Sequence, residues 1–312
     1  MKNDKKTVFI TGSTGFIGKN IVEHLKDNYI LLTPPHKDLN LFFQKDVRTF
    51  FLRNEIDCVI HCANFGGTRK TPGVGEVIEK NMRMFFNLAE NQDRFQTLIH
   101  MGSGGEYNKC RDIQKIPEEE FGSQIPTEEH GFSKYLISKY IEQTENMYCL
   151  RLFGIFGKYE DYEFKFVSNA IIKNLLSMPI TIRQNVYFNW LYIEDFFKIL
   201  DYFLTHKPKY PSYNITTPDP IDLVSISELI NSISDFKSEI IVENEGLNYE
   251  YSGSNTRLSE EIPGLTFTPM KSALKDLIRY YQKILPEIDP DTIRKDAYAA
   301  SCKINPILNK ES

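Results

Sequence analysis

The chain has 312 residues, with 37 basic and 42 acidic side chains, a formal charge of −5 and 41% hydrophobic residues. This length fits one large domain or two smaller ones with an ample core. The mild acidity and the scattered Lys and Arg residues argue against a nucleic-acid-binding protein, which would carry a basic face. No apolar run approaches the roughly 18 residues that a membrane span needs, so we expect no membrane partner either.

The cysteines and the first residues indicate the cellular compartment. The five cysteines follow no disulfide or zinc-binding pattern. The charged first six residues lead directly into a strand-like segment, without the apolar stretch of a secretory signal. We therefore expect a cytoplasmic protein with reduced thiols and no metal site.

In the first half of the chain, short apolar runs alternate with longer amphipathic segments. The apolar runs predict buried strands, and the segments between them carry apolar residues at helical spacing. The predicted strands cover residues 7–11, 30–33, 58–61, 97–101 and 149–152, and the helices cover 17–26, 45–54, 74–91 and 131–143. This alternation predicts an α/β fold with a doubly wound parallel sheet, which binds ligands at the carboxyl ends of its strands.

The second half of the chain breaks this rhythm. We predict helices over 163–177, 194–204, 225–234 and 271–283, and strands over 187–193 and 239–242. Such a mixture indicates a smaller α/β unit packed beside the first one. The turn-rich stretch from residue 286 to 312 carries no clear pattern.

A glycine-rich turn joins the first strand to the first helix. Gly12 can form the tight turn, Gly15 allows a pyrophosphate to approach the backbone, and Gly18 allows helix and strand to pack closely. The start of the helix offers free amide groups and the positive end of its dipole to phosphates. We therefore predict that a dinucleotide binds at Gly12, Ser13, Thr14, Gly15, Phe16, Ile17 and Gly18.

The spacing Gly-x-x-Gly-x-x-Gly resembles that of the extended short-chain dehydrogenase/reductase family, also called the NAD-dependent epimerase/dehydratase family. Further matching segments follow in family order: Asp38–Leu41, Asp57–Asn64, Lys80–Met82, Met101–Ser103, Arg151–Gly157 and Asn189–Asp195. The resemblance implies a Rossmann-type dinucleotide-binding domain over residues 1–155, together with about 188–222, and a substrate-binding domain over 156–312. It also implies a nucleotide-sugar substrate and a homodimer.

The segment after the second strand bears on the choice of cofactor. Family members that prefer NAD place an acidic residue directly after this strand, on the ribose hydroxyls. Here no acid follows at once, and His36 and Lys37 could face a 2′-phosphate, unless they belong to a solvated surface turn. Asp38 could still act as a displaced ribose ligand. We favour NADP, with NAD as the alternative, and expect the remaining cofactor contacts from Leu39, Cys62, Ala63 and Asn64, with Asp57 steadying the adenine side.

The resemblance implies a catalytic Ser, Tyr and Lys. Ser103, at the end of the fourth strand, matches the serine. A search for Tyr-x-x-x-Lys finds Tyr135 and Lys139, but the family segment Tyr-Gly-x-Ser-Lys matches residues 130–134, with His130 in place of the tyrosine and Lys134 as the lysine. At about 100° per residue, Tyr135 lies some 140° around the helix from His130. We therefore predict that Tyr135 is a packing residue.

A histidine in place of the tyrosine changes the chemistry. The reference pKa of histidine, about 6.5, lies far below that of tyrosine, about 10, and a nearby Lys ammonium should lower it further. A neutral imidazole is a weak proton donor. His130 could act as an acid at lower pH, the chain could be a tyrosine-to-histidine variant, or the protein could bind a nucleotide sugar without converting it.

Residues after Ser103 narrow the reaction. Related dehydratases carry acids where this chain has Gly104 and Gly105, so dehydration is disfavoured. The layout is most similar to GDP-fucose synthase-like reductases, which epimerise with a cysteine at the second of these positions and a later histidine. This chain has Gly105 there and no histidine between Gly131 and Thr205. A base beside the carbonyl is therefore missing.

The sequence thus favours an NAD(P)-dependent reductase that acts at C4 of a 4-keto-6-deoxy sugar nucleotide for surface-polysaccharide synthesis. The alternatives are a 4-epimerase that retains NAD and a nucleotide-sugar-binding protein without activity. Predicted substrate contacts are Gly104, Gly105, Glu106, Asn189 and Arg257, although the side chain of Glu106 could instead be solvated.

Overall fold

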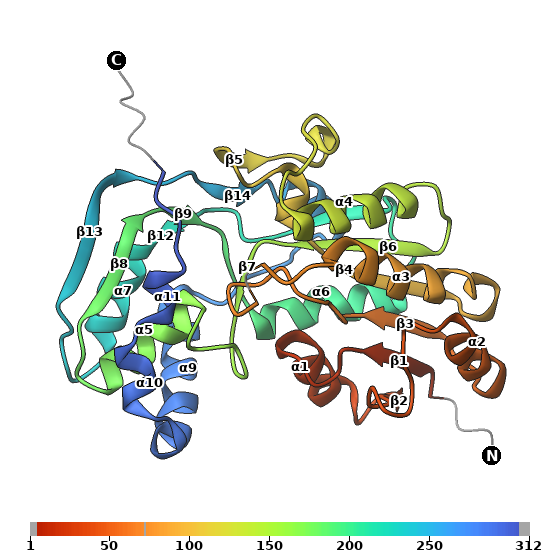
Figure 1. Cartoon of the computed structure of the whole chain (residues 1–312), viewed down its shortest axis with the longest axis horizontal. Coiled ribbons are helices and arrows are strands. Elements are labelled where there is room, and N and C mark those ends of the chain that lie inside the picture. The colour runs from red at the N-terminus through yellow and green to blue at the C-terminus, as the bar shows by residue number, and fades with distance from the viewer. Residues whose placement is uncertain (1–4, 72, 306–312) are drawn as a thin grey trace.

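The protein is described by a computed structural model that covers residues 5–71 and 73–305 (Figure 1). Its centre is a six-stranded parallel sheet. The strands lie in the order β11 (Ser212–Ile215), β6 (Met147–Leu152), β4 (Thr97–Ser103), β3 (Cys58–His61), β1 (Thr7–Thr11) and β2 (Ile30–Leu32). This is the doubly wound, Rossmann-type sheet that the sequence predicted.

Alternating side chains of each strand divide between two apolar layers. In β1, Val8 and Ile10 pack into one layer and Phe9 into the other, because successive side chains of a strand point to opposite faces. One layer is completed by α1 (Phe16–Leu25) and α6 (Ile193–Thr205). The other is completed by α2 (Gln44–Arg53), α3 (Val77–Ala89) and α4 (Glu129–Ile141). Both faces of the sheet are therefore covered, which explains why its strands are rich in apolar residues.

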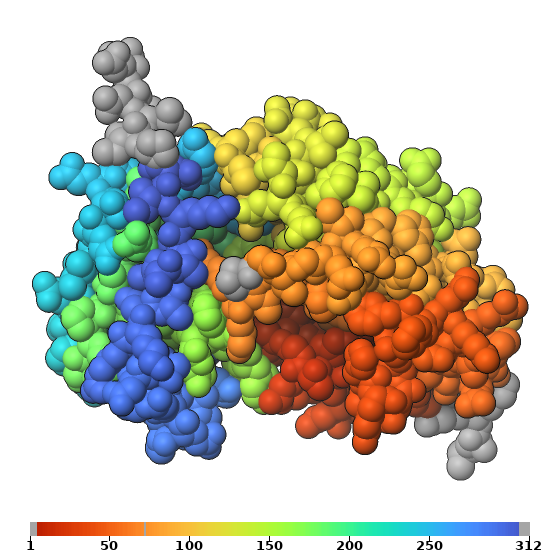
Figure 2. All heavy atoms as spheres, in the orientation of Figure 1, coloured from red at the N-terminus to blue at the C-terminus, as the bar shows by residue number. Residues whose placement is uncertain are grey.

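The order of the strands reverses at β1. The strand β2 lies on one side of β1, whereas β3 and β4 lie on the other side. In α/β sheets, ligands bind at such a switch point, outside the carboxyl ends of the strands. The carboxyl ends of β1 and β3 point toward the middle of the molecule in Figure 1. A recess opens there in Figure 2, between the red N-terminal segment and the orange segment that follows β3.

The second unit has its own apolar core. The helices α5 (Phe166–Leu175), α7 (Leu223–Ile233) and α9 (Met270–Ile284) pack against β8 (Ile180–Asn185), which pairs with β13 (Ile240–Leu247). Four short strands form another sheet in the order β12 (Ile221–Asp222), β9 (Tyr187–Phe188), β14 (Tyr251–Gly253) and β5 (Ile113–Ile116). Smaller elements are β7 (Gly154–Phe156), β10 (Trp190–Tyr192), α8 (Thr256–Glu261), α10 (Pro290–Arg294) and α11 (Ala297–Ala300), with single turns η1 (Gln92–Arg94), η2 (Gly104–Tyr107), η3 (Glu118–Glu120) and η4 (Leu285–Glu287).

The predicted strand over 187–193 is wrong in one respect. Two short strands, β9 and β10, replace it and belong to different sheets. Asn189 lies between them and is wholly buried. Its side chain donates to Thr217 O at 2.8 Å and accepts from Gly253 N at 2.8 Å. Asn189 thus satisfies these two backbone groups from the point where the chain leaves one sheet for the other.

Several strands and short helices escaped prediction. The strand β5 has only four residues, with polar side chains at its two central positions. The strand β8 depends on its distant partner β13, and α10 and α11 occupy the stretch for which the sequence carried no pattern. The division into two domains stays a prediction. Within residues 188–222, β11 joins the first sheet and α6 packs on it, whereas β12 pairs with β9 in the second unit. No helix within 5–71 or 73–305 is long and apolar enough to cross a membrane.

Candidate active site

The glycine-rich turn has the geometry that its three glycines predict. Gly12 has a φ of 65°, and a Cβ atom there would lie 2.6 Å from Ala63 N. A Cβ atom on Gly18 would lie 2.2 Å from Gly12 O, whereas one on Gly15 would meet nothing closer than this oxygen at 3.4 Å. Gly15 caps α1 without a side-chain hydrogen bond, so amide groups at the helix start stay free for an anion.

The end of β3 is tied to the same turn. Thr11 Oγ1 lies 2.8 Å from His61 Nδ1 and accepts from Ala63 N at 3.2 Å. These contacts bring Cys62 and Ala63 beside Gly12. Asn64 continues the segment and donates to Gly66 O at 2.9 Å. The predicted residues 12–18 and 62–64 therefore lie together at the switch point of the sheet.

The segment after β2 divides into an exposed turn and a core residue. His36, Lys37 and Asp38 are exposed, so their side chains are free to meet a ligand. Leu39 is only 5% exposed and packs into the layer beneath α2. Its side chain therefore belongs to the core, and a cofactor contact through its backbone stays a prediction.

Asp57 also lies elsewhere than predicted. Its carboxylate accepts from Thr7 N at 2.7 Å and from Gln96 Nε2 at 3.0 Å. Thr7 begins β1, so Asp57 lies at the amino ends of the strands, opposite the cofactor edge. It joins the starts of neighbouring strands and does not support the adenine side.

Ser103 ends β4 and caps the short turn η2. Its Oγ accepts from Gly105 N at 3.1 Å. The first turn of α4 packs against the same turn, because a Cβ atom on Gly131 would lie 2.6 Å from Gly105 O. Only glycine allows this approach, and it brings the start of α4 beside Ser103.

His130 and Lys134 lie one turn apart on α4. Lys134 is buried and donates to Met101 O at 2.8 Å. His130 packs against Gly67, where a Cβ atom would lie 2.5 Å from His130 Cβ. Burial, with Lys134 as the next cause, lowers the pKa of His130 to about 3. Its Nδ1 is buried without a hydrogen-bond partner among the described residues, so His130 is a neutral imidazole at pH 7.

Tyr135 has a packing role, as predicted. Its ring lies 5.1 Å from that of Phe121 and is stacked at 6.4 Å on Phe132. The tyrosine of the Tyr-x-x-x-Lys match is therefore part of an aromatic group on another face of α4.

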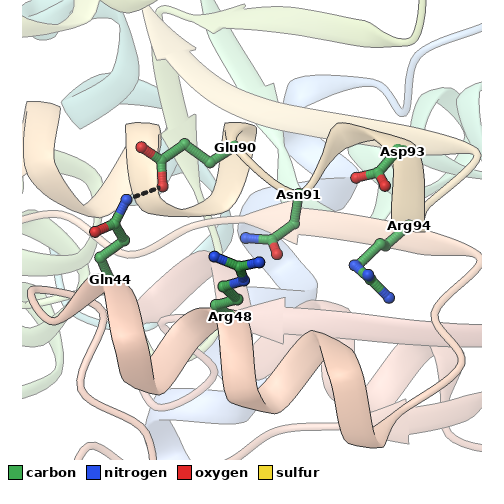
Figure 3. A pocket seen from close by; sticks show the side chains of 6 residues that line it. All are labelled: Gln44, Arg48, Glu90, Asn91, Asp93 and Arg94. Atoms are coloured by element: carbon green, nitrogen blue, oxygen red, sulfur yellow. Dashed lines mark hydrogen bonds between the residues drawn. The ribbon is translucent and has the colours of Figure 1, made fainter.

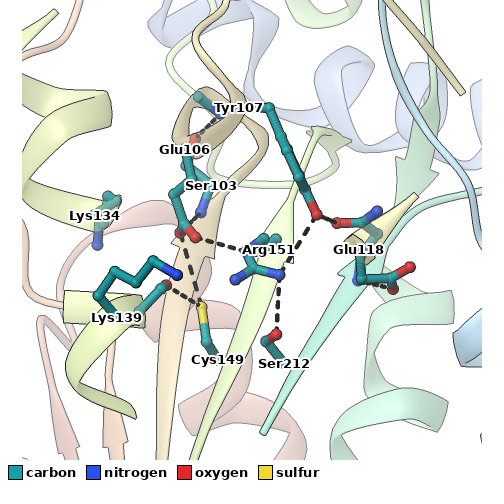
Figure 4. Close-up of polar contacts among 12 residues, drawn as sticks. Ser103, Glu106, Tyr107, Glu118, Lys134, Lys139, Cys149, Arg151 and Ser212 are labelled. Atoms are coloured by element: carbon teal, nitrogen blue, oxygen red, sulfur yellow. Dashed lines mark hydrogen bonds and ion pairs between the residues drawn. The ribbon is translucent and has the colours of Figure 1, made fainter. Parts of the chain in front are cut away.

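Glu106 is turned into the core, so its predicted contact with a substrate is corrected. Its Oε1 accepts from Ser103 N at 2.9 Å, and its Oε2 accepts from Arg151 Nε at 2.6 Å. Both charged side chains are 0% exposed. Arg151 also donates to Ser212 Oγ at 2.9 Å, as Figure 4 shows. Glu106 thus holds the turn that carries Ser103.

Two other predicted substrate contacts have structural partners. Asn189 uses its side chain on backbone groups of the second unit, as described above. Arg257 donates to Glu119 Oε1 at 2.6 Å and to Ser212 O at 3.2 Å, and its guanidinium stacks 4.5 Å from the ring of Tyr210. The prediction for Asn189 is corrected, because its side chain is wholly buried, whereas a substrate contact of Arg257, whose side chain is 16% exposed, stays a prediction.

The sequence missed two residues near the site. Tyr251 comes from β14, and its hydroxyl is packed against Gly104, where a Cβ atom would lie 2.7 Å from Tyr251 Oη. Lys165 precedes α5 and is one of the charges that lower the pKa of His130. Neither residue lies in a motif, and only the packing of the second unit on the first brings them to Ser103 and His130.

A separate polar groove of about 390 Å³ lies between α2 and the end of α3 (Figure 3). It is lined by Gln44, Arg48, Glu90, Asn91, Asp93 and Arg94, none of which belongs to the site described above. Within the described parts of the chain, no group of three or more His, Cys, Asp or Glu side chains is placed to hold a metal ion.

Known proteins resemble this chain in sequence and in fold. The model of the NAD-dependent epimerase/dehydratase family matches residues 8–216. The GDP-L-colitose synthase of Yersinia pseudotuberculosis is 22% identical over 261 residues, which cover 76% of this chain and 84% of that protein. Among solved structures, an NADP-bound GDP-L-fucose synthetase from Naegleria fowleri has a TM-score of 0.78 at 16% identity, covering 92% of this chain and 96% of that one.

A second solved structure is the GDP-mannoheptose C4 reductase MlghC from Campylobacter jejuni with NADP bound. Its TM-score is 0.76 at 17% identity, covering 89% of this chain and 98% of that one. At such identities the solved structures establish the shared fold, and the family model covers more than half of the chain. The chain belongs to the NAD-dependent epimerase/dehydratase family.

Proposed function

We propose that this protein is an NAD(P)H-dependent reductase acting at C4 of a 4-keto-6-deoxy sugar nucleotide. The observation that carries this proposal is the turn after Ser103. A Cβ atom on Gly104 would lie 2.6 Å from the ring of Phe153, and Gly105 packs against Gly131. No acid of a dehydratase and no cysteine of an epimerising reductase is present at these positions. Without a base for carbon-bound protons, reduction is the simplest reaction that the site supports.

The cofactor is proposed to be NADP(H), with NAD(H) as the alternative. The free amide groups at the start of α1 fit a pyrophosphate, and exposed His36 and Lys37 fit a 2′-phosphate. The bound nicotinamide would supply the hydride. Lys134 fits a role at the nicotinamide ribose, because its Nζ lies at the end of β4 and has two further protons to donate beyond the bond to Met101 O.

Basic side chains near His130 support a nucleotide-linked substrate. Burial is the largest cause that lowers the pKa of His130, and Lys134, Lys109 and Lys165 lower it further, with Glu128 acting against them. Burial also lowers the pKa of Lys165, Glu160 acts against it, and Arg69 and Lys109 lower it further. Lys165 directly precedes α5, whose first amide groups favour an anion. In a chain of net charge −5, this cluster is suited to a diphosphate. The names of the relatives favour GDP as the nucleotide.

His130 favours a second candidate, a protein that binds a nucleotide sugar without converting it. A neutral imidazole donates a proton poorly, so the usual tyrosine chemistry is not available at this position. A 4-epimerase that retains NAD is the remaining alternative, and the absence of an acid directly after β2 counts against it.

The test uses the purified full-length protein. First, the nucleotide released on denaturation is identified, and then NADPH consumption is followed with a GDP-linked 4-keto-6-deoxyhexose. We expect NADP that exchanges freely and one NADPH consumed per sugar reduced. Tightly held NAD with interconversion of GDP-hexoses would instead identify an epimerase. Sugar binding without either reaction would identify a binding protein. Ser103→Ala is the control for activity from the site itself.

A further inference from the structure

A tyrosine of the second unit reaches the turn that carries Ser103. Tyr251 begins β14 and pairs with Phe188 of β9 and Ile113 of β5. Its ring lies 5.1 Å from that of Phe153 and 5.7 Å from that of Phe188. These aromatic neighbours fix the ring, and the hydroxyl faces Gly104. A larger residue at position 104 would displace it.

The hydroxyl of Tyr251 lies against Gly104, the residue that follows Ser103. Burial is the largest cause that raises its pKa, the Ser103 side chain and the Gly105 backbone act in the opposite direction, and the charges of Glu106 and Glu128 raise it further. At neutral pH the phenol therefore keeps its proton and remains a donor.

Reduction of a carbonyl leaves an alkoxide, which must receive a proton. The residue in the usual tyrosine position, His130, is neutral. Two other tyrosines near the turn are committed elsewhere: Tyr107 donates to Asn214 Oδ1 at 2.9 Å in the core, and Tyr135 packs against Phe121. The Tyr251 hydroxyl lies against Gly104, next to Ser103, and no carboxylate or amide side chain of residues 5–71 and 73–305 forms a hydrogen bond with it.

We infer that Tyr251 is the proton donor to the sugar oxygen and that Ser103 holds this oxygen beside it. The inference rests on the proposed function. The carbonyl carbon accepts the hydride with its electron pair, and the π electrons of the C=O bond move to the oxygen. The O–H bond of Tyr251 then breaks as a new O–H bond forms on the sugar, and the phenolate regains its proton from solvent. An alkoxide is a stronger base than a phenolate, so this transfer is favourable even with a raised pKa.

The first test compares two single-hydroxyl deletions. Tyr251→Phe removes the proposed donor, and Tyr187→Phe removes an exposed hydroxyl from the adjacent strand β9. Loss of a proton donor lowers turnover by about 10²- to 10⁴-fold. We expect kcat for a GDP-linked 4-keto-6-deoxyhexose to fall in this range in Tyr251→Phe and to stay unchanged in Tyr187→Phe. Equal turnover in the two variants would overturn the inference.

A second test places Tyr251→Phe in a His130→Tyr background. A tyrosine at position 130 supplies an alternative donor, so the loss caused by Tyr251→Phe should shrink to less than about threefold. The same large loss in both backgrounds would show that Tyr251 acts on the fold of the site and not on the proton. Circular dichroism and thermal unfolding verify that each variant is folded.

A binding measurement separates this inference from the proposed function. The affinities of GDP-L-fucose and of GDP are measured by calorimetry for the wild type and for Tyr251→Phe. We expect Tyr251→Phe to weaken GDP-L-fucose binding by about fivefold, as loss of one hydrogen bond does, and to leave GDP binding unchanged. If the wild type reduces no keto sugar, the proposed reaction fails, and this contrast still decides whether the Tyr251 hydroxyl contacts the sugar. Equal affinities of wild type and variant would exclude contact with the sugar.

Discussion

The carboxylate of Glu106 and the guanidinium of Arg151 form an ion pair at 2.6 Å, and both side chains are 0% exposed. The other oxygen of Glu106 accepts from Ser103 N. This pair therefore positions the turn with the predicted catalytic serine. Removing one partner of a buried pair leaves an uncompensated charge, which costs about 3–5 kcal/mol.

We expect Arg151→Met to reduce the free energy of unfolding by about 3–5 kcal/mol, measured by urea denaturation. Replacing both residues, as in Glu106→Leu with Arg151→Met, leaves no buried charge and should restore much of this stability. The double variant should nevertheless lose turnover, because nothing then fixes Ser103 N. A single variant as stable as the wild type would contradict the proposed importance of the pair.

The glycines of the first turn should separate folding from cofactor binding. Gly18→Ala places a Cβ atom 2.2 Å from Gly12 O, and such overpacking costs about 1–3 kcal/mol. Gly15→Ala meets only an ordinary contact at 3.4 Å, and an alanine cap costs about 1 kcal/mol or less relative to glycine. We expect Gly15→Ala to remain folded and to bind NADPH at least about tenfold more weakly, because its methyl group occupies the pyrophosphate approach. Thermal unfolding and fluorescence titration measure the two effects.

His36 and Lys37 should determine the preference between the two nicotinamide cofactors. Loss of a charge-assisted contact to the 2′-phosphate costs about 1.4 kcal/mol, a tenfold change in affinity. The double variant His36→Ala with Lys37→Ala should therefore bind NADPH about tenfold more weakly and NADH unchanged. Lys45→Ala, which removes another exposed lysine at the start of α2, is the control. If both cofactors lose affinity equally, the turn does not recognise the 2′-phosphate.

His130→Tyr should raise turnover. A phenol one turn before Lys134 is expected to have its pKa lowered by the ammonium, which makes it a better acid than Tyr251. We expect kcat to increase by about tenfold or more in the NADPH assay with a GDP-linked 4-keto-6-deoxyhexose. His206→Tyr, an exposed site on the first unit, controls for the substitution. An unchanged or lower rate would mean that position 130 does not serve the reacting oxygen.

Buried imidazoles should make the protein less stable in acid. Burial lowers the pKa of His61 and of His130 to about 3, and that of His100 well below its usual value. Between these values and about 6.5, the unfolded chain binds protons that the folded one does not, so stability falls as the pH decreases through this window. Glu160, whose pKa burial raises to about 7, acts in the opposite direction and weakens the net trend.

The contribution of a single imidazole can be isolated with His100→Leu, since neither ring nitrogen of His100 has a partner among the described residues. The stability lost between pH 7.5 and 5.5, both about one unit from the reference pKa, should be smaller in this variant by about 1.4 kcal/mol. Urea denaturation at the two pH values measures the difference. An identical loss in wild type and variant would mean that His100 gains the same fraction of a proton in the folded as in the unfolded protein over this pH range.

Local patterns in the sequence predicted the parts of the site that neighbouring residues form. The roles of Gly12 and Gly18 follow from a strand that must turn into a helix within a few residues, and the structure has the expected φ and close contacts. The helix register that places His130 and Lys134 on one face and Tyr135 on another depends only on helical periodicity. The first and third strands were predicted with their observed bounds, because each is a short run of apolar residues.

Contacts between distant segments were beyond such patterns. Glu106 lies three residues after Ser103, yet whether it faces the substrate or the core depends on Arg151 in another strand. Asn189 and Arg257 were predicted as substrate contacts, whereas their partners in the structure lie far along the chain. Tyr251 had no local signal at all.

The sequence by itself determined the family, the dinucleotide turn and the order of Ser103, His130 and Lys134 along the chain, because strand and helix periods act over a few residues. Only the tertiary structure decided which charged side chains are neutralised inside the protein and which hydroxyl lies beside Ser103. Those outcomes depend on how the second unit packs on the first, where burial determines the partner and the protonation state of each group.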